Sequence, residues 1–238
     1  MGSTEGEFTL RPGTAADLPG VLEVYAASVL ASGIPEARPE AEVRAWIGTS
    51  LDDGKELWVA ARAEALLGFA VVHEDWLFLL FVHPDRPARG VGAGLMAMIK
   101  TLRPQGLGLR VHRANERARA FYRRHGFVEL EQTDGSDYSD REPDVKMAWL
   151  GGDPLGYLRG RIDDVDDELA VLLARRAALT AAVQDRKEVG GHAGRDPDRE
   201  AEIVARMSRH VPDLDPGVLA RIMHSVISES LAAWEQRS

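Results

Sequence analysis

The chain contains no cysteine among its 238 residues. This absence excludes disulfides, a thiolate nucleophile and a metal site built on cysteine. It agrees with a reducing compartment, and we expect a cytoplasmic protein. The acidic start of the chain, Met1 to Leu10, lacks the basic and then apolar order of a signal peptide.

Long apolar runs and excess positive charge are also missing. No stretch approaches the roughly 18 apolar residues of a membrane-spanning helix, so we expect no membrane partner. The net charge is −9, which argues against a nucleic-acid partner. Residues 1–150 carry 17 basic and 22 acidic side chains, and residues 151–238 carry 12 and 16. Any site for an anion must therefore be a local cluster.

The first part of the chain alternates between strand and helix patterns up to Leu150, which is typical of an α/β or α+β sheet domain. The predicted strands are Phe8–Arg11, Leu57–Ala61, Leu66–Val72, Leu77–Val82, Leu107–Val111, Phe127–Glu131 and Val145–Leu150. The predicted helices are Asp17–Ala31, Pro39–Leu51, Val91–Leu102 and Asn115–His125.

The strand signal stops at residues 151–154, a Gly-Gly-Asp-Pro linker. A long helix is predicted from Leu155 to about Val189, and two shorter helices follow it, from Asp196-Pro197 to about His210 and from Asp215-Pro216 to Trp234. A helix of roughly 34 residues is about 50 Å long, and two shorter helices cannot cover it. The pattern therefore predicts domains at 1–150 and 155–238, with the second forming a homodimer through its long helix.

A glycine-rich turn follows the strand that ends at Val82. Gly90, Gly92 and Gly94 open the next helix, where close backbone approach and unpaired N–H groups suit an anion. The alternative is an ordinary strand-to-helix turn. In a second segment Asn115 and Tyr122 are seven residues apart, so they share a helix face. They could meet one ligand, or they could be a helix cap and a core aromatic residue.

Together these segments resemble the GNAT acyltransferase superfamily over roughly residues 7–150. The resemblance rests on Thr9-Leu10-Arg11-Pro12…Asp17-Leu18, Arg89-x-x-Gly92-x-Gly94 and Asn115…Ala118…Phe121-Tyr122…Gly126-Phe127. It implies acetyl-CoA, or another acyl-CoA, as cofactor. It also implies pantetheine pairing at Val82, cofactor contact at Asn115 and a proton from Tyr122 for the thiolate. The implied cofactor site also includes Arg89, Gly90, Val91, Gly92, Ala93, Gly94 and Leu95.

The substrate amine must also lose a proton when it attacks the thioester. His73, Glu74 and Asp75 are the candidate bases, directly or through water, although exposed turn residues are an equal interpretation. The acidic residues Asp134, Asp137 and Asp140 would suit a cationic acceptor, but a solvated loop fits them better. The acyl acceptor stays open.

In the helical part, Arg176 and Lys187 are eleven residues apart and would share a helix face. Arg159 lies on another face and could reach only a partner's pocket. Two carboxylates, Asp196 and Glu200, flank Arg199 at the start of the next helix. Such a set suits a small polyanion that carries hydroxyls, although charged helix faces are common on surfaces.

The spacing of these residues resembles the all-helical class of chorismate mutases over about residues 155–237. The resemblance implies an intertwined dimer of three-helix chains that needs no cofactor and no metal. Arg159 would cross to the partner, and Lys187 would bind a carboxylate and the ether oxygen. Arg176 and Arg199 would bind carboxylates or support the pocket, and Asp196 and Glu200 would meet the ring hydroxyl. The implied reaction is the Claisen rearrangement of chorismate to prephenate, which needs a held conformer and fixed cations.

The last helix departs from the family, which places Ser or Thr there and Gln or Glu four residues later. Ser230 is followed at that spacing by Trp234, and Leu231 by Glu235. We favour the second register, with Glu235 at the ether oxygen and the family's hydroxyl lost, and Ser230 stays in the set of candidate substrate-binding residues. A protonated glutamate would give a mutase rate that falls as pH rises.

These features predict a bifunctional enzyme that joins an N-acyltransferase to a chorismate mutase, both acting on small molecules. Two alternatives stay open. The helical domain could act on isochorismate or 4-amino-4-deoxychorismate. It could also be a dimerisation or metabolite-sensing module that regulates the acyltransferase.

Overall fold

A computed structural model describes residues 8–32, 40–86, 88–135, 142–186, 196–211 and 214–236. Contacts divide the chain into two compact units, Met1–Arg159 and Gly160–Ser238. The break falls inside a helix, because Tyr157 in the first turn of that helix packs against Gly106 and Gly108 of the sheet unit. Among the described residues, no helix is long and apolar enough to cross a membrane.

The first unit is built on a seven-stranded sheet in the order β1-β2-β3-β4-β5-β7-β6. All seven predicted strands are confirmed, each within two residues at either end. Their bounds are β1 Thr9–Pro12, β2 Glu56–Arg62, β3 Ala65–His73, β4 Trp76–Val82, β5 Leu107–His112, β6 Val128–Thr133 and β7 Asp144–Trp149.

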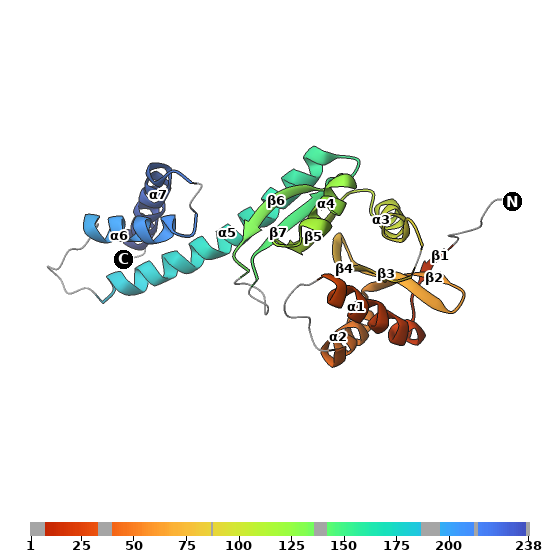
Figure 1. The fold of residues 1–238 in the computed structure, drawn as a ribbon. Coiled ribbons are helices and arrows are strands. Elements are labelled where there is room, and N and C mark those ends of the chain that lie inside the picture. The colour runs from red at the N-terminus through yellow and green to blue at the C-terminus, as the bar shows by residue number, and fades with distance from the viewer. Residues whose placement is uncertain are drawn as a thin grey trace. The chain divides into compact units, whose positions relative to one another are not determined.

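The helices of this unit lie on both faces of the sheet (Figure 1). Their bounds are α1 Leu18–Ser32, α2 Glu40–Asp52, α3 Val91–Leu102 and α4 Glu116–Arg124, with a short 3-10 turn η1 at Ala15–Asp17. α1 and α2 pack with alternate residues of β2–β4, such as Val59 and Phe69. α3 and α4 pack with the other set, including Ala70, Leu77 and Leu109. Both faces are therefore buried, as the interleaved pattern predicts.

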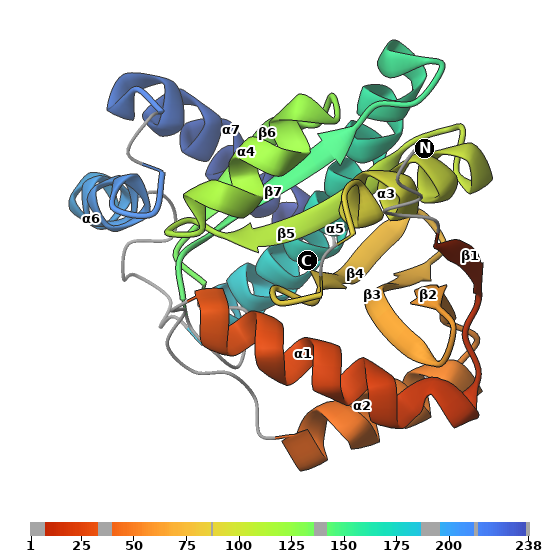
Figure 2. The same cartoon turned by 45° about the vertical axis from the view of Figure 1, so that its right-hand side comes forward.

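The sheet opens between its two central strands. β4 and β5 run parallel and pair only at Trp76–Gly108 and Leu77–Leu109. Beyond these pairs the two strands separate, as Figure 2 shows. The backbone edges from Phe78 to Val82 and from Arg110 to His112 face each other without ladder pairing.

The second unit is all-helical, as predicted, with α5 Pro154–Gln184, α6 Pro197–Ser208 and α7 Pro216–Glu235. Asp196 and Asp215 cap α6 and α7, and proline follows each cap. The predicted end of α5 near Val189 is wrong. The helix stops at Gln184 because Arg186 N–H turns back to the Val183 carbonyl at 3.2 Å. The Arg186 side chain also donates to the Ala182 carbonyl at 2.9 Å.

Candidate active sites

The glycine-rich turn forms an open helix N-terminus at the end of β4. Gly90 is the N-cap of α3, with φ of 84°, in the left-handed region that favours glycine. No side chain of the described residues caps this end, so the N–H groups of the first turn have no partner within the helix. Gly94 packs closely, because a Cβ there would lie 3.2 Å from the Phe8 ring, which is tighter than an ordinary contact. This geometry suits an anion held by backbone groups.

Val82 lies on the β4 edge that faces the opening between β4 and β5. On its other edge, Val82 pairs with Gly68 of β3. Its carbonyl accepts a hydrogen bond from Ser28 Oγ of α1 at 2.7 Å. The contact ties α1 to the strand edge on which we expect pantetheine. Sequence reasoning missed Ser28, because a lone serine in a helix gives no signal of its own.

Asn115 and Tyr122 lie on α4, but their side chains are placed differently. The Asn115 side chain is the N-cap and accepts from Ala118 N–H at 3.0 Å, so a ligand would meet its amide nitrogen. Tyr122 is 9% exposed and packs in the core beside Phe127. Burial raises the pKa of the Tyr122 phenol above its usual value. The phenol therefore stays protonated at neutral pH, as a proton donor must.

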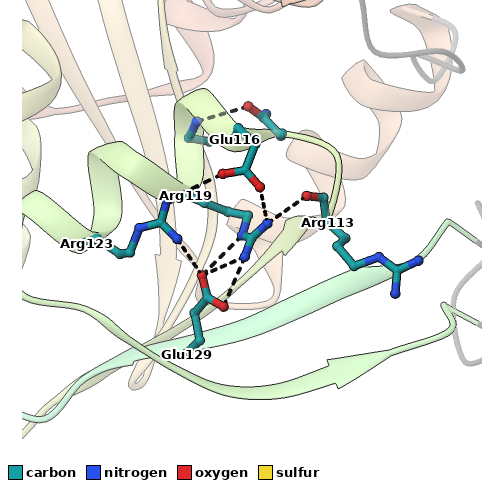
Figure 3. Close-up of polar contacts among 7 residues, drawn as sticks. Arg113, Glu116, Arg119, Arg123 and Glu129 are labelled. Atoms are coloured by element: carbon teal, nitrogen blue, oxygen red, sulfur yellow. Dashed lines mark hydrogen bonds and ion pairs between the residues drawn. The ribbon is translucent and has the colours of Figure 1, made fainter.

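A network around Arg119 holds the turn that carries Asn115 (Figure 3). The Arg119 guanidinium donates to both oxygens of Glu129, at 2.9 and 3.1 Å, and also pairs with Glu116. Its Nη1 donates to the Arg113 carbonyl at 3.1 Å. Arg123 also pairs with Glu116 and Glu129, and neither of these ion pairs reaches the Arg113 carbonyl of the turn. Arg119 is thus the side chain that joins the turn to β6.

The three candidate bases lie at the paired end of β4: His73 ends β3, and Glu74 and Asp75 form the β3–β4 turn. The Asp75 carbonyl accepts from Gly108 N–H at 2.7 Å, which closes the sheet there. Glu74 is in the left-handed region with φ of 49°. β4 has seven residues. About 20 Å therefore separates its first end, beside the candidate bases, from its last end at Val82. Asp137 and Asp140 of the acidic loop are outside the described residues.

In the helical unit, the structure brings together Arg176 of α5 and Ser230 of α7. Arg176 Nη1 donates to Ser230 Oγ at 3.2 Å, and that hydroxyl donates to the Val226 carbonyl at 2.6 Å. Ser230 is only 7% exposed. Trp234, one turn further, donates from Nε1 to Asp185 Oδ1 at 2.7 Å. Glu235 is exposed, so the face that meets Arg176 carries Ser230 rather than the favoured Glu235.

Among the other predicted substrate residues, Asp196 and Arg199 have partners within α6. Asp196 caps α6 by accepting from Arg199 N–H at 3.0 Å, and the Arg199 side chain pairs with Glu202 at 2.8 Å. Arg159 is exposed on the first turns of α5. Lys187 is outside the described residues.

The geometry defines a sheet domain with an uncapped helix start, joined to a helical domain with a part-buried bond between Arg176 and Ser230. Two protein-family models match these parts. Residues 53–129 match the acetyltransferase (GNAT) domain, and residues 158–234 match chorismate mutase type II. The chain therefore combines a GNAT acetyltransferase domain with a type II chorismate mutase domain, and both families are families of enzymes.

Solved structures support the fold of the first domain. The apo form of YjaB from Escherichia coli is 24% identical, with a TM-score of 0.52, over 61% of this chain and 99% of that one. A GCN5-related N-acetyltransferase from Rhodopseudomonas palustris is 20% identical, with a TM-score of 0.52, over 63% of this chain and 99% of that one. A search of curated proteins finds no match.

Proposed function

We propose that the helical domain rearranges chorismate to prephenate, and that the sheet domain transfers an acyl group, acetyl in the simplest case, from coenzyme A to an amine. The working domains are residues 1–150 and 155–238, joined by 151–154. In support, β7 ends at Trp149 and α5 begins at Pro154. Cysteine-free composition supports a cytoplasmic location.

The bond between Arg176 and buried Ser230 carries the mutase proposal. A guanidinium held by a buried hydroxyl keeps one orientation, so it can meet a substrate carboxylate without reorganising. The rearrangement needs a fixed conformer and positive charge beside the ether oxygen. Lys187 is the proposed source of that charge. Asp196 and Glu200, one helical turn apart on α6, are proposed to meet the ring hydroxyl, and Arg199 to support the pocket.

Ser230 rather than Glu235 is the α7 residue that we place beside the substrate, because it contacts Arg176. The two registers differ in their pH dependence. A protonated Glu235 at the ether oxygen would give a mutase rate that falls as pH rises. With Ser230 in the pocket, the rate is flat from pH 5 to 8, and Glu235→Gln leaves it unchanged.

A homodimer is the proposed working form, because Arg159 and Arg176 are seventeen residues apart on one helix. That separation is about 25 Å along the axis, so the two cannot serve one site in one chain. A stripe of apolar side chains on α5 repeats at spacings of three or four residues, as in a two-stranded coil, with Arg176 occupying the position between Leu172 and Leu179. Its members are 48–61% exposed: Ile162, Val165, Leu169, Leu172, Leu179 and Val183. A second copy would cover them.

Mixing two inactive variants tests the shared site. Arg159→Ala and Arg176→Ala dimers should each lose mutase activity. After subunit exchange, half of the dimers are mixed, and each of these has one intact site. About a quarter of wild-type activity should return. No recovery, with exchange verified by mass, would show that both arginines act within one chain.

For acyl transfer, the supporting observation is the uncapped α3 helix start beside the open edge of β4. The N–H groups of Val91, Gly92 and Ala93 at the start of α3 are proposed to hold the pyrophosphate, with Gly94 and Leu95 completing the turn and Arg89 nearby. Val82 would pair with the pantetheine arm and Asn115 would donate its amide N–H. The amine nitrogen attacks the thioester carbon and would give its proton to one of the three candidate bases at the β3–β4 turn, directly or through water. The carbon–sulfur bond breaks, and Tyr122 protonates the departing thiolate.

Binding of acetyl-CoA tests the proposed acyl transfer by the sheet domain. Acetyl-CoA should raise the melting temperature, because a ligand of the folded state stabilises it. It should do so equally in the Arg176→Ala variant. An absence of any shift at saturating acetyl-CoA would overturn the acyltransferase proposal. For the helical domain, chorismate that is not consumed would instead point to the regulatory or alternative-substrate interpretation.

A further inference from the structure

An irregularity in β4 lies where the sheet opens. In the pairing of β3 with β4, Val71 faces Leu79 and Val72 faces Leu77, so Phe78 has no partner residue on β3. The β4–β5 pairing ends at Leu77–Leu109, directly before Phe78. An extra residue in a strand turns its side chain out of the regular alternation, and such bulges concentrate next to active sites. Phe78 is thus presented at the point where the proposed acyl transfer occurs.

Phe78 points to the face of the sheet that carries α1 and α2. Its ring lies 5.9 Å from that of Trp46 on α2, at an interplanar angle of 50°. Leu77 and Leu80 instead join the core under α3. Although it lies within a central strand, Phe78 is 39% exposed. The two rings therefore form an aromatic surface on the face opposite the glycine-rich helix.

A cation accompanies these rings. Lys55 Nζ lies 5.7 Å from the centre of the Phe78 ring and 6.0 Å from that of Trp46. Its nearest carboxylate among the described ion pairs, Asp53, is 3.8 Å away and mostly exposed. A contact that long and that exposed is weak. The ammonium group can therefore meet a second carboxylate beside the two rings.

We propose that Trp46, Phe78 and Lys55 select the acyl acceptor as an amine that carries both an aromatic ring and a carboxylate. The ring packs against Phe78 and Trp46, because aromatic rings attract one another in edge and tilted arrangements. The carboxylate pairs with Lys55, and the amine then faces the opening between β4 and β5. The inference rests on the proposed acyl transfer and specifies its acceptor.

Three matched amines test the proposal: L-phenylalanine, L-cyclohexylalanine, which lacks the aromatic ring, and 2-phenylethylamine, which lacks the carboxylate. With acetyl-CoA, wild-type kcat/KM for phenylalanine should exceed that for each of the others by about tenfold. Phe78→Leu should remove the preference over cyclohexylalanine, and Lys55→Met the preference over 2-phenylethylamine. KM for acetyl-CoA should stay unchanged in both. Leu130→Ala, an equally exposed apolar position on β6, should keep both preferences.

Ratios near one in the wild type, or ratios that survive both substitutions, would overturn the proposal. Amine binding to the CoA-saturated protein, followed by calorimetry, gives a second readout that does not need turnover. Tighter binding of phenylalanine than of cyclohexylalanine, lost in Phe78→Leu, would support the site. Equal or undetectable binding would overturn it. If acetyl-CoA itself does not bind, the acyl transfer has failed, and the amine preferences measured without cofactor still decide the acceptor surface.

Discussion

The two domains hold their site residues by different means. In the sheet domain, the elements that frame the proposed site pack on a buried core. Tyr122 packs there beside Phe127, and Val91, which follows the N-cap Gly90, is also buried. In the helical domain, the buried apolar side chains among the described residues are only Leu219 and Met223. The stripe on α5 is more than 45% exposed throughout. In the proposed assembly, a single chain therefore completes the first site, whereas the second site also needs Arg159 of the partner subunit.

Charging the α5 stripe should give the largest effect. The double variant Leu169→Glu with Leu172→Glu places like charges against each other in a dimer, and we expect a monomer. Mutase activity should fall about 100-fold or more, because the pocket loses the partner's arginine. Light scattering and prephenate formation measure the two effects. Glu168→Ala, on the same helix beside the stripe, is the control. A dimeric double variant, or a fully active monomer, would contradict the proposed assembly.

Loss of Arg176 should affect only the helical site. Arg176→Met should reduce mutase kcat/KM by about 100- to 1000-fold, as for removal of one preorganised donor. The neighbouring Arg175→Met, at an exposed position, should have little effect. Acetyl-CoA binding should be unchanged in both. Comparable losses in the two variants would mean that general charge, rather than the bond to Ser230, matters.

Tyr122→Phe probes the proton donor of the sheet domain. We expect kcat for acyl transfer to fall about 10- to 100-fold while the KM for acetyl-CoA changes little. The raised pKa of Tyr122 keeps the phenol protonated from pH 6 to 9, so the loss should be constant over that range. Steady-state rates across this range measure it. A loss that appears only at one end of the range would assign the titration to another group.

Gly90→Ala tests the helix start. A Cβ at Gly90 meets no atom within 4 Å, so its only cost is the left-handed backbone, about 1–2 kcal/mol. We expect lower stability and weaker acetyl-CoA binding. Gly48→Ala, also without contacts but inside α2 with ordinary φ, should instead stabilise by about 0.5–1 kcal/mol. Chemical denaturation compares the two. Equal effects of the two substitutions on stability would contradict the cost assigned to the left-handed backbone at Gly90.

Asp17→Asn should have the smallest effect. The bond to Arg11 at 2.7 Å lowers the pKa of Asp17 to about 2. Because the folded pKa lies below the unfolded value, this stabilisation is present above about pH 4 and is lost as pH falls toward 2. The variant should be about 1–2 kcal/mol less stable at pH 7, and the difference should vanish near pH 2. A difference independent of pH would show that packing, rather than charge, is lost.

Every described strand and α-helix, and most of their boundaries, followed from sequence, because the periods of two and 3.6 residues are local properties. The glycine-rich turn, the Asn115 cap and the capped starts of α6 and α7 were equally local. The end of α5 was not, because Asp185 and Arg186 make contacts with α7 and with the last helical turn that no spacing reveals.

The sequence by itself determined two domains, their fold classes and the families to which they correspond. The tertiary structure decided which side chains meet: Arg176 with Ser230, Ser28 with Val82, and Phe78 with Trp46 at the opening of the sheet. These contacts join residues 54, 54 and 32 positions apart. Helix crossing and strand bulging set them, and both depend on how whole elements pack rather than on any local pattern.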